Sequence, residues 1–146
     1  MRIWRRVLTS ALLLGAVAAC AGGPSSRLKT VAAATGEGPI DFRVKNTTDV
    51  PINSLYIAPT AVIDTAGREH IAYGSTEADR VWGPDLITGG ALEVGGEQRV
   101  PVDAPGRFDI KVHDKDGRHQ HVSGLKLGAG GRYILELGEG GWRVGP

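Results

Sequence analysis

From residue 39 to its end, the chain consists of short stretches in which apolar and polar residues alternate. Phe108-Asp109-Ile110-Lys111-Val112 is the clearest of them. Because successive side chains of a β-strand point to opposite faces, this period of two predicts strands with one buried and one exposed face. The 22 glycines and 8 prolines supply turns between such strands and disfavour long helices. The alternation therefore predicts an all-β fold.

The turn residues give this fold its expected outline. Gly95-Gly96 and Asp116-Gly117 are suited to tight hairpins, and residues 64–67 would join a further pair of strands. With about seven or eight short strands and no convincing amphipathic helix, we expect a single antiparallel β-sandwich of the immunoglobulin-like kind over residues 39–146. The ranges that predict strands are 40–44, 52–58, 91–94, 98–102, 108–112, 119–122 and 132–137, and the further candidates are a hairpin of 61–63 with 70–73 and a closing strand at 142–144.

The first residues have a different character. Arg2, Arg5 and Arg6 precede an apolar run at 7–19, which is the layout of an export signal. The run of about 13 residues is shorter than the roughly 20 that a membrane-spanning helix needs. A cleaved signal peptide is therefore favoured over a permanent transmembrane anchor.

The apolar run ends in Val17-Ala18-Ala19-Cys20, which resembles the lipobox of bacterial lipoproteins. The resemblance implies that residues 1–19 are a signal peptide and that Cys20 carries lipid and becomes the first residue after cleavage. Two or three acyl chains would hold the protein on a membrane without any protein surface entering the bilayer. The alternative is an ordinary signal peptide cut near Ala19, with a cysteine there by chance. Cys20 is the single cysteine of the chain, which excludes a disulfide framework.

The segment after the cysteine has no apolar period. Residues 20–38 are rich in glycine, serine and alanine, so we expect a flexible tether between membrane and domain. In the lipoproteins that the lipobox resembles, an aspartate directly after the cysteine tends to retain the protein at the inner membrane. Here that residue is Ala21. The resemblance therefore implies the outer membrane rather than the inner one.

Charge narrows the range of partners. Without residues 1–19 the chain has 14 basic and 16 acidic side chains, and lysine and arginine form no cluster along the sequence. Nucleic-acid binding is dominated by neutralisation of phosphates, so this balance argues against a nucleic-acid partner.

Gly128-Ala129-Gly130-Gly131 precedes an expected strand instead of a helix, which argues against a phosphate-binding loop. We expect no cofactor.

The order of segments resembles a small domain of uncharacterised function that occurs in many exported bacterial proteins. The likeness covers most of residues 39–137 and implies a compact β-sandwich without an established catalytic centre. The chain departs from that pattern by inserting residues 60–80. The segments that carry the likeness are Asn46-Thr47, Leu55-Tyr56-Ile57-Ala58-Pro59, Trp82-Gly83-Pro84-Asp85-Leu86, Gly95-Gly96, Phe108-Asp109-Ile110-Lys111 and Gly124-Leu125-Lys126-Leu127.

Three histidines form the candidate metal site. His113, His119 and His121 fall around one expected hairpin, and residues 119 and 121 would project from the same face of a strand, as two metal-ligating imidazoles could. The other interpretation is that these are polar residues on the solvated face of an antiparallel sheet. No His-Glu-x-x-His spacing or second cysteine supports a metal.

The inserted segment is the candidate surface for a partner. Arg68, Glu69, Trp82 and Asp85 lie within or beside it, although a lone tryptophan in a sandwich more often packs in the core. We therefore expect a membrane-anchored, non-catalytic interaction or structural module of the cell envelope. One alternative is a metal-binding lipoprotein that uses the three histidines. The other is a hydrolase of envelope polymers, which no Gly-x-Ser-x-Gly elbow supports.

Overall fold

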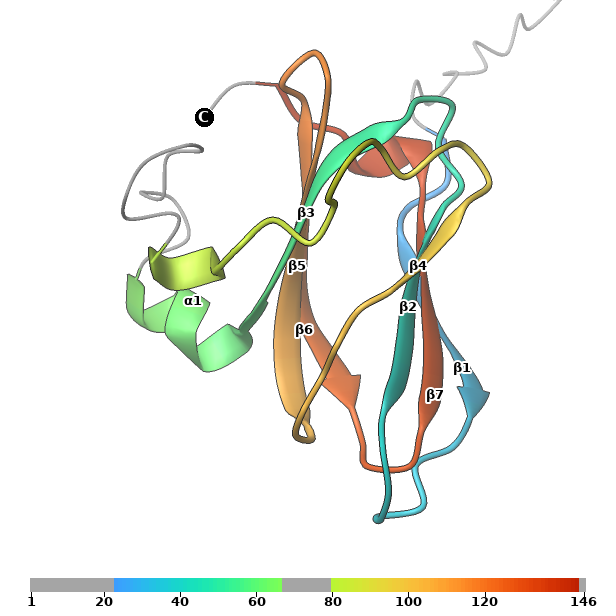
Figure 1. Cartoon of the computed structure of the whole chain (residues 1–146), viewed down its shortest axis with the longest axis vertical. Coiled ribbons are helices and arrows are strands. Elements are labelled where there is room, and N and C mark those ends of the chain that lie inside the picture. The colour runs from blue at the N-terminus through green and yellow to red at the C-terminus, as the bar shows by residue number, and fades with distance from the viewer. Residues whose placement is uncertain (1–22, 67–79, 145–146) are drawn as a thin grey trace, which may run out of the picture.

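The computed structural model describes residues 23–66 and 80–144, which form two β-sheets packed face to face (Figure 1). One sheet has the strand order β3-β5-β6 and consists of β3 (Ile52–Pro59), β5 (Gly106–Asp114) and β6 (His119–Leu127). The other has the order β1-β7-β2-β4 and consists of β1 (Arg27–Ala32), β2 (Asp41–Asn46), β4 (Glu97–Arg99) and β7 (Arg132–Leu137). The expected all-β sandwich is confirmed, with β2 and β7 as a parallel pair among antiparallel ones.

The alternation along the strands builds the core between the sheets. In β2, Phe42 and Val44 are fully buried whereas Arg43 between them is exposed. Burial of each such large apolar side chain contributes about 1.5–3 kcal/mol. The buried cluster consists of Ile40, Phe42, Val44, Ile52, Leu55, Leu92, Val100, Ile110, Val112, Leu125, Leu127, Tyr133, Leu135 and Leu137.

The expected hairpin at Asp116-Gly117 is confirmed. It joins β5 to β6, and His113 pairs with His119 next to the turn. Gly117 has a φ of +81°, a conformation that costs glycine little and other residues more. Asp114 closes the turn, because its Oδ1 accepts the backbone N–H groups of Asp116 and Arg118, both at 2.9 Å.

The tether expected at residues 20–38 is wrong for its central part. Residues 27–32 form β1, which pairs antiparallel with β7 at the edge of the four-stranded sheet. The sequence does not show this strand, because Leu28 is its single residue that packs against the core and the others are exposed or polar. Backbone pairing with β7 therefore holds β1 in place more than apolar burial does.

The strand expected at 61–63 is a helix. Pro59 ends β3, and α1 (Thr60–Ala66) follows directly. Ile63 and Ala66, three positions apart, both turn toward the sheet, as the period of a helix requires. A short apolar run such as Ala61-Val62-Ile63 fits a strand or a helix equally well. The partner strand expected at 70–73 lies outside the described residues.

Gly95-Gly96 makes a tight turn but not the expected hairpin. Gly96 N–H donates to the carbonyl of Glu93 at 2.9 Å, and Gly95 has a φ of +80°. Leu92, before the turn, pairs with Ile52 of β3, whereas β4, after the turn, pairs with β2. The turn thus carries the chain from one sheet to the other.

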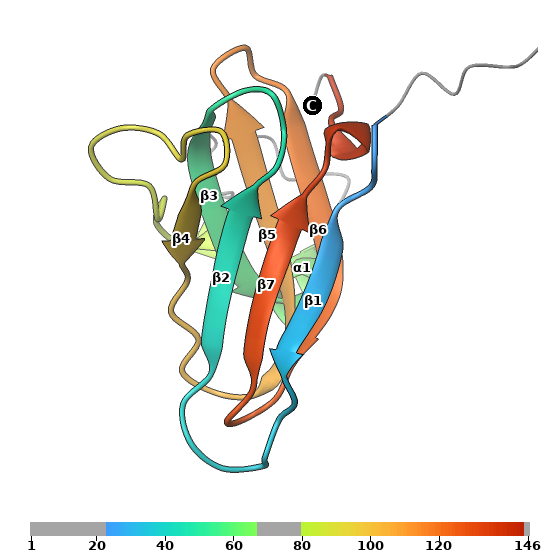
Figure 2. The same ribbon diagram turned by 90° about the vertical axis from the view of Figure 1, so that its right-hand side faces the viewer.

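The C-terminal segment does not form the strand expected at 142–144. A short 3-10 helix, η1 (Glu139–Gly141), follows β7, and Arg143 then makes an isolated bridge with His119. Val144 is exposed. The last described residues therefore cap one end of the sandwich beside β6 (Figure 2).

Candidate functional site

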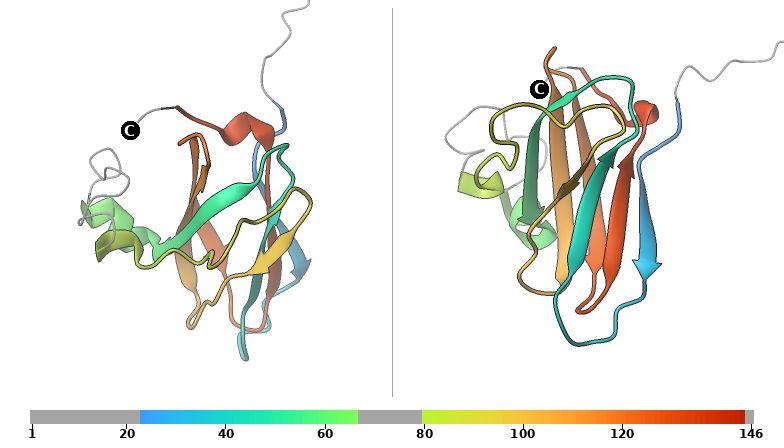
Figure 3. Two further views of the ribbon diagram at one scale, coloured as in Figure 1. Left: turned by 45° about the horizontal axis from the view of Figure 1, so that its top comes forward. Right: turned by 45° about the vertical axis from the view of Figure 1, so that its right-hand side comes forward.

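The outer face of the three-stranded sheet is covered by α1 and by residues 80–82, which are also helical (Figure 3). Ala58 of β3, Ile63 of α1 and Trp82 form a second buried cluster, separate from the main core. This covering begins directly after Pro59. Residues 60–66 and 80–82 thus add a layer to the sandwich.

Asp109 of β5 is the centre of the polar contacts under this layer. It is fully buried, and its Oδ1 accepts the hydroxyl of Thr60 at 2.6 Å and the backbone N–H of Gly124 at 2.9 Å. Its Oδ2 lies 2.8 Å from Nε2 of His121. One carboxylate therefore ties α1, β5 and β6 together.

These bonds set the charge of Asp109. Burial of the carboxyl raises the pKa of Asp109, but hydrogen bonds from Thr60, Gly124 and His121 outweigh burial and hold that pKa below its usual value. The sequence placed Asp109 on the polar phase of a strand, which is correct, but gave no sign that the residue would be buried. Thr60 is the partner that alternation could not reveal, because it lies 49 positions away.

Trp82 and Asp85 do not form the expected partner surface. Trp82 is buried, its ring meets that of His121 edge to face at 5.2 Å, and Lys111 Nζ lies 5.8 Å from the ring centroid. Asp85 Oδ1 accepts the backbone N–H groups of Leu55 and Ile87, so it fastens its loop to β3. Both side chains have structural contacts. Arg68 and Glu69 lie outside the described residues.

Ser123, His121 and Asp109 lie in a row that resembles a catalytic triad in composition. Ser123 Oγ is 3.4 Å from Nε2 of His121, and Asp109 Oδ2 is 2.8 Å from the same nitrogen. In a serine triad the carboxylate and the serine bind different ring nitrogens, so that one holds the ring while the other gives up its proton. Because both partners share Nε2 here, this arrangement does not activate Ser123.

The structure separates the three histidines by their contacts. His113 and His119 are cross-strand neighbours with ring centroids 6.1 Å apart, whereas His121 is engaged by Asp109. Among the residues that the structure describes, no group of three or more histidine, cysteine, aspartate or glutamate side chains is placed to hold a metal ion. Burial, with Lys111 and His119 nearby, lowers the pKa of His113 to about 4.

A groove opens where α1 leaves β3. It has a volume of about 680 Å³, within the range of roughly 300–1,000 Å³ typical of ligand sites. Its walls are mainly apolar and include three prolines, and charged side chains stand at its rim. The residues that the groove brings together are Ile57, Pro59, Ala61, Asp64, Pro101, Val102, Asp103, Ala104, Pro105, Arg107 and Phe108.

Only one wall of this groove is predictable from the sequence. The segment that starts at Thr60 stands out, but the expected strand at 98–102 is too long, because residues 101–105 form the irregular connection between β4 and β5. Pro101 and Pro105 were a usable signal, because proline lacks the N–H that a central strand needs.

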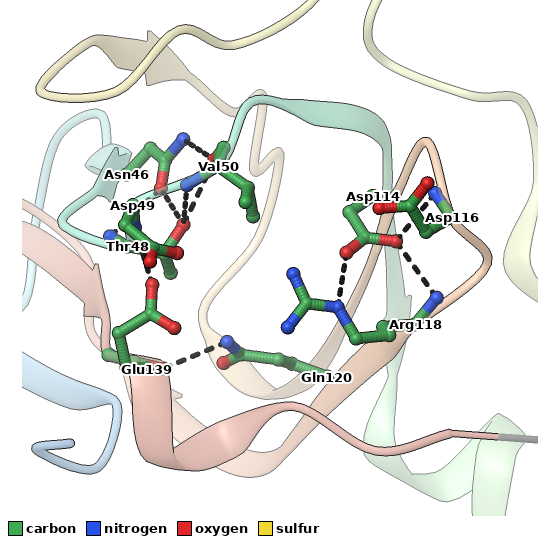
Figure 4. A network of polar contacts seen from close by, with 10 residues as sticks. Asn46, Thr48, Asp49, Val50, Asp114, Asp116, Arg118, Gln120 and Glu139 are labelled. Carbon is green, nitrogen blue, oxygen red and sulfur yellow. Dashed lines mark hydrogen bonds and ion pairs between the residues drawn. The ribbon is translucent and has the colours of Figure 1, made fainter. Parts of the chain in front are cut away.

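A further polar cluster at one end of the sandwich serves the fold (Figure 4). Asn46 Nδ2 donates to the carbonyls of Val50 and Leu92, while its Oδ1 accepts from Thr48. On the other side, Arg118 Nε donates to Asp114 Oδ2 at 2.6 Å. Every polar atom of Asn46 is used, so this cluster holds a turn in shape.

None of the helices in the described part of the chain has the length and apolar character needed to span a bilayer. Comparison of the chain with family models, curated proteins and solved structures found no match in any of the three. The resemblances to lipoproteins and to the exported β-sandwich domain thus stay predictions of the sequence.

Proposed function

We propose that the protein is a cell-envelope lipoprotein, anchored to a membrane by lipid on Cys20, whose β-sandwich is a non-catalytic module that binds an extended apolar segment of a partner protein in the groove beside α1. The lipobox at Val17-Ala18-Ala19-Cys20 supports the anchor. The outer membrane is the proposed location, since Ala21 and not aspartate follows the cysteine.

The observation that carries the binding role is how the polar and apolar groups are distributed. Two carboxylates near α1 have their bonding taken up by the fold, because Asp109 is bonded to three groups and Asp85 to two backbone N–H groups. The groove that α1 and the 101–105 loop enclose is lined mainly by apolar side chains. Such a surface suits the displacement of water from an apolar partner.

The walls of the groove favour an extended peptide as its occupant. Pro59, Pro101 and Pro105 are fixed in shape and lack backbone N–H groups, so they offer a rigid apolar surface. Asp64, Asp103 and Arg107 also line the groove and could bind the polar backbone and side chains that flank an apolar anchor.

Site-specific photocrosslinking in intact cells tests this proposal. A photoreactive residue at Ala61 or at Ala104, on the two walls of the groove, should give an adduct of the same mass, and the exposed control position Lys115, in the hairpin at the other end of β5, should not. Ala104→Arg should abolish the adduct from position 61 by filling the groove, while Lys115→Ala leaves it unchanged. Equal adducts from all three positions, or none from the groove, would contradict the proposal.

A further inference from the structure

The outer surface of the four-stranded sheet carries twice as many basic as acidic side chains, and ion pairs join several of them. Strand register places alternate residues of β1, β7, β2 and β4 on this surface, because their neighbours Phe42, Val44, Tyr133 and Leu135 point into the core. Figure 2 shows this sheet facing the viewer, and its outward positions hold six bases and three acids, which we call the basic face. They are Arg27, Lys29, Arg43, Lys45, Arg99 and Arg132, with Asp41, Glu97 and Glu136.

Charge is therefore separated within the protein. The other parts of residues 20–146 hold eight basic and thirteen acidic side chains, so the basic face is positive on a chain that is otherwise negative. No run of lysine or arginine shows this in the sequence, because the six bases come from four strands that are distant along the chain.

The basic side chains of this face are also more exposed to solvent than the acidic ones. The side chains of Arg27 and Arg132 are 68% and 60% exposed, whereas those of Glu136 and Asp41 are 23% and 27% exposed. Long basic side chains extend over the shorter carboxylates and present their charged ends to the solvent. An approaching surface thus meets cations first.

One row across the sheet lacks acids altogether. Lys29, Ile134, Arg43 and Arg99 are register neighbours on successive strands. Arg43 lies directly opposite Arg99, and like charges in such cross-strand pairs are destabilising. Acids of the neighbouring rows offset part of this repulsion, because Lys29 Nζ lies 2.6 Å from Glu136 Oε1 and Arg43 Nε lies 3.3 Å from Asp41 Oδ1. A negatively charged partner would remove this repulsion.

The N-terminal connection brings this sheet close to the anchoring point. Gly140 N–H donates to the carbonyl of Pro24 at 3.1 Å, and Ser26 Oγ donates to Gln120 and accepts from Gly138 N–H. The chain is thus bonded to the domain from Pro24 onward, and the four steps from Cys20 span at most about 14 Å. The next element is β1, an edge strand of the basic sheet.

We propose that the basic face docks on the anionic phospholipid headgroups of the membrane that holds the chain, so that α1, which lies on the opposite side of the sandwich, points away from that membrane (Figure 1). This proposal rests on the proposed lipid at Cys20 for its geometry. Lysine and arginine near a negatively charged bilayer are attracted to it within about a Debye length, roughly 8 Å at physiological salt.

Vesicle binding of the unlipidated chain tests the face independently of the anchor. The mature chain, residues 20–146 with Cys20→Ala, keeps every strand of both sheets. It should sediment with vesicles of phosphatidylcholine containing phosphatidylglycerol and not with phosphatidylcholine alone, and 0.5 M NaCl should release it. The triple variant Lys29→Gln, Arg43→Gln, Arg99→Gln should lose at least tenfold in partition coefficient.

A matched variant controls for total charge. Arg80→Gln, Lys115→Gln, Lys126→Gln removes three exposed bases from the side of the sandwich that bears the other sheet, and its partition coefficient should stay within about twofold of the parent's. Arg43→Lys, Arg99→Lys should keep binding, which shows that the loss comes from charge and not from folding. Melting temperatures of all variants are measured alongside.

Three results would overturn the proposal: equal losses in the two triple variants, no preference for anionic vesicles, or binding to a soluble polyanion such as single-stranded DNA without binding to vesicles. Lipidation of Cys20 is measured independently, by mass spectrometry of the native protein. Loss of vesicle binding leaves Cys20 lipidation untouched, and an unmodified Cys20 leaves vesicle binding by the purified chain untouched.

Discussion

At the residue scale, the most informative side chains are polar ones that the core encloses. Asn46 is fully buried at the end of β2, and its amide makes four hydrogen bonds, to Val50, Leu92 and both N–H and Oγ of Thr48. Buried polar groups cost free energy when they lose their partners. Asn46 therefore fixes the turn that leads from the four-stranded sheet to β3.

Replacement of Asn46 should show this role. Asn46→Ala leaves the Thr48 N–H and two carbonyls without their side-chain partner, so we expect a loss of about 2–4 kcal/mol in the free energy of unfolding. Chemical denaturation measures it. Asn53→Ala, at an exposed position on β3, is the control and should change stability by less than about 0.5 kcal/mol. Similar effects of the two substitutions would contradict the assignment.

His113 should make the stability depend on pH. Burial lowers the pKa of His113 to about 4, so the folded protein disfavours the proton that the unfolded chain binds near pH 6.5. The contribution of neutral His113 to the free energy of unfolding is then fully present above pH 6.5 and is lost as pH falls toward 4. The lowered pKa of His119, also caused mainly by burial, acts in the same direction.

His113→Phe tests this dependence, because it keeps an aromatic ring against Tyr56 and removes the titrating group. Between pH 6.5 and pH 4 we expect the free energy of unfolding of the parent to fall by on the order of 2–3 kcal/mol, and that of the variant to fall clearly less. Denaturation midpoints over this pH range give the answer. A parent whose midpoint is flat over the range, or a variant with the parent's slope, would contradict the account.

At the scale of elements, Asp109 is the link between α1 and the sheet. Asp109→Ala removes the carboxylate that accepts from Thr60, from the Gly124 N–H and from His121. We therefore expect a loss of about 2–4 kcal/mol in the free energy of unfolding. Hydrogen exchange should increase most in residues 60–66. Asp103→Ala, on an exposed loop position, should leave exchange in α1 unchanged. A uniform increase over all strands would argue against a local link.

The second element whose role can be tested is β1. A chain that begins at residue 33 lacks β1 and exposes the edge of β7, whereas one that begins at residue 24 keeps it. We expect the shorter chain to be at least about 2 kcal/mol less stable, because it loses backbone pairing and the packing of Leu28. Equal denaturation midpoints would restore the interpretation of this segment as a tether.

The elements show what local pattern can and cannot predict. Alternation made five strands predictable, namely β2, β3, β5, β6 and β7, because their apolar residues recur at alternate positions and enter the core between the sheets. β1 and α1 were not, since backbone pairing holds the first and contact with the sheet selects the helical form of the second. Register across strands is equally absent from local pattern. For that reason the basic face and the Asp109 contacts emerged from the structure alone.

At the scale of the whole molecule, the two sheets carry different surfaces. The three-stranded sheet bears α1 and the apolar groove, and the four-stranded sheet bears the basic face. The groove residues and the lipobox segment were accessible to sequence reasoning, at least in part. The separation of charge between the faces was not, because it depends on which strands are neighbours.

The central claim is that Cys20 carries lipid and holds this two-faced sandwich on a membrane. Mass spectrometry of the N-terminal peptide from native protein tests it most directly. We predict that residues 1–19 are absent and that the peptide begins at Cys20 with the added mass of a diacylglyceryl group. A peptide that still contains residues 1–19, or one that begins at Cys20 with a free thiol, would contradict the claim.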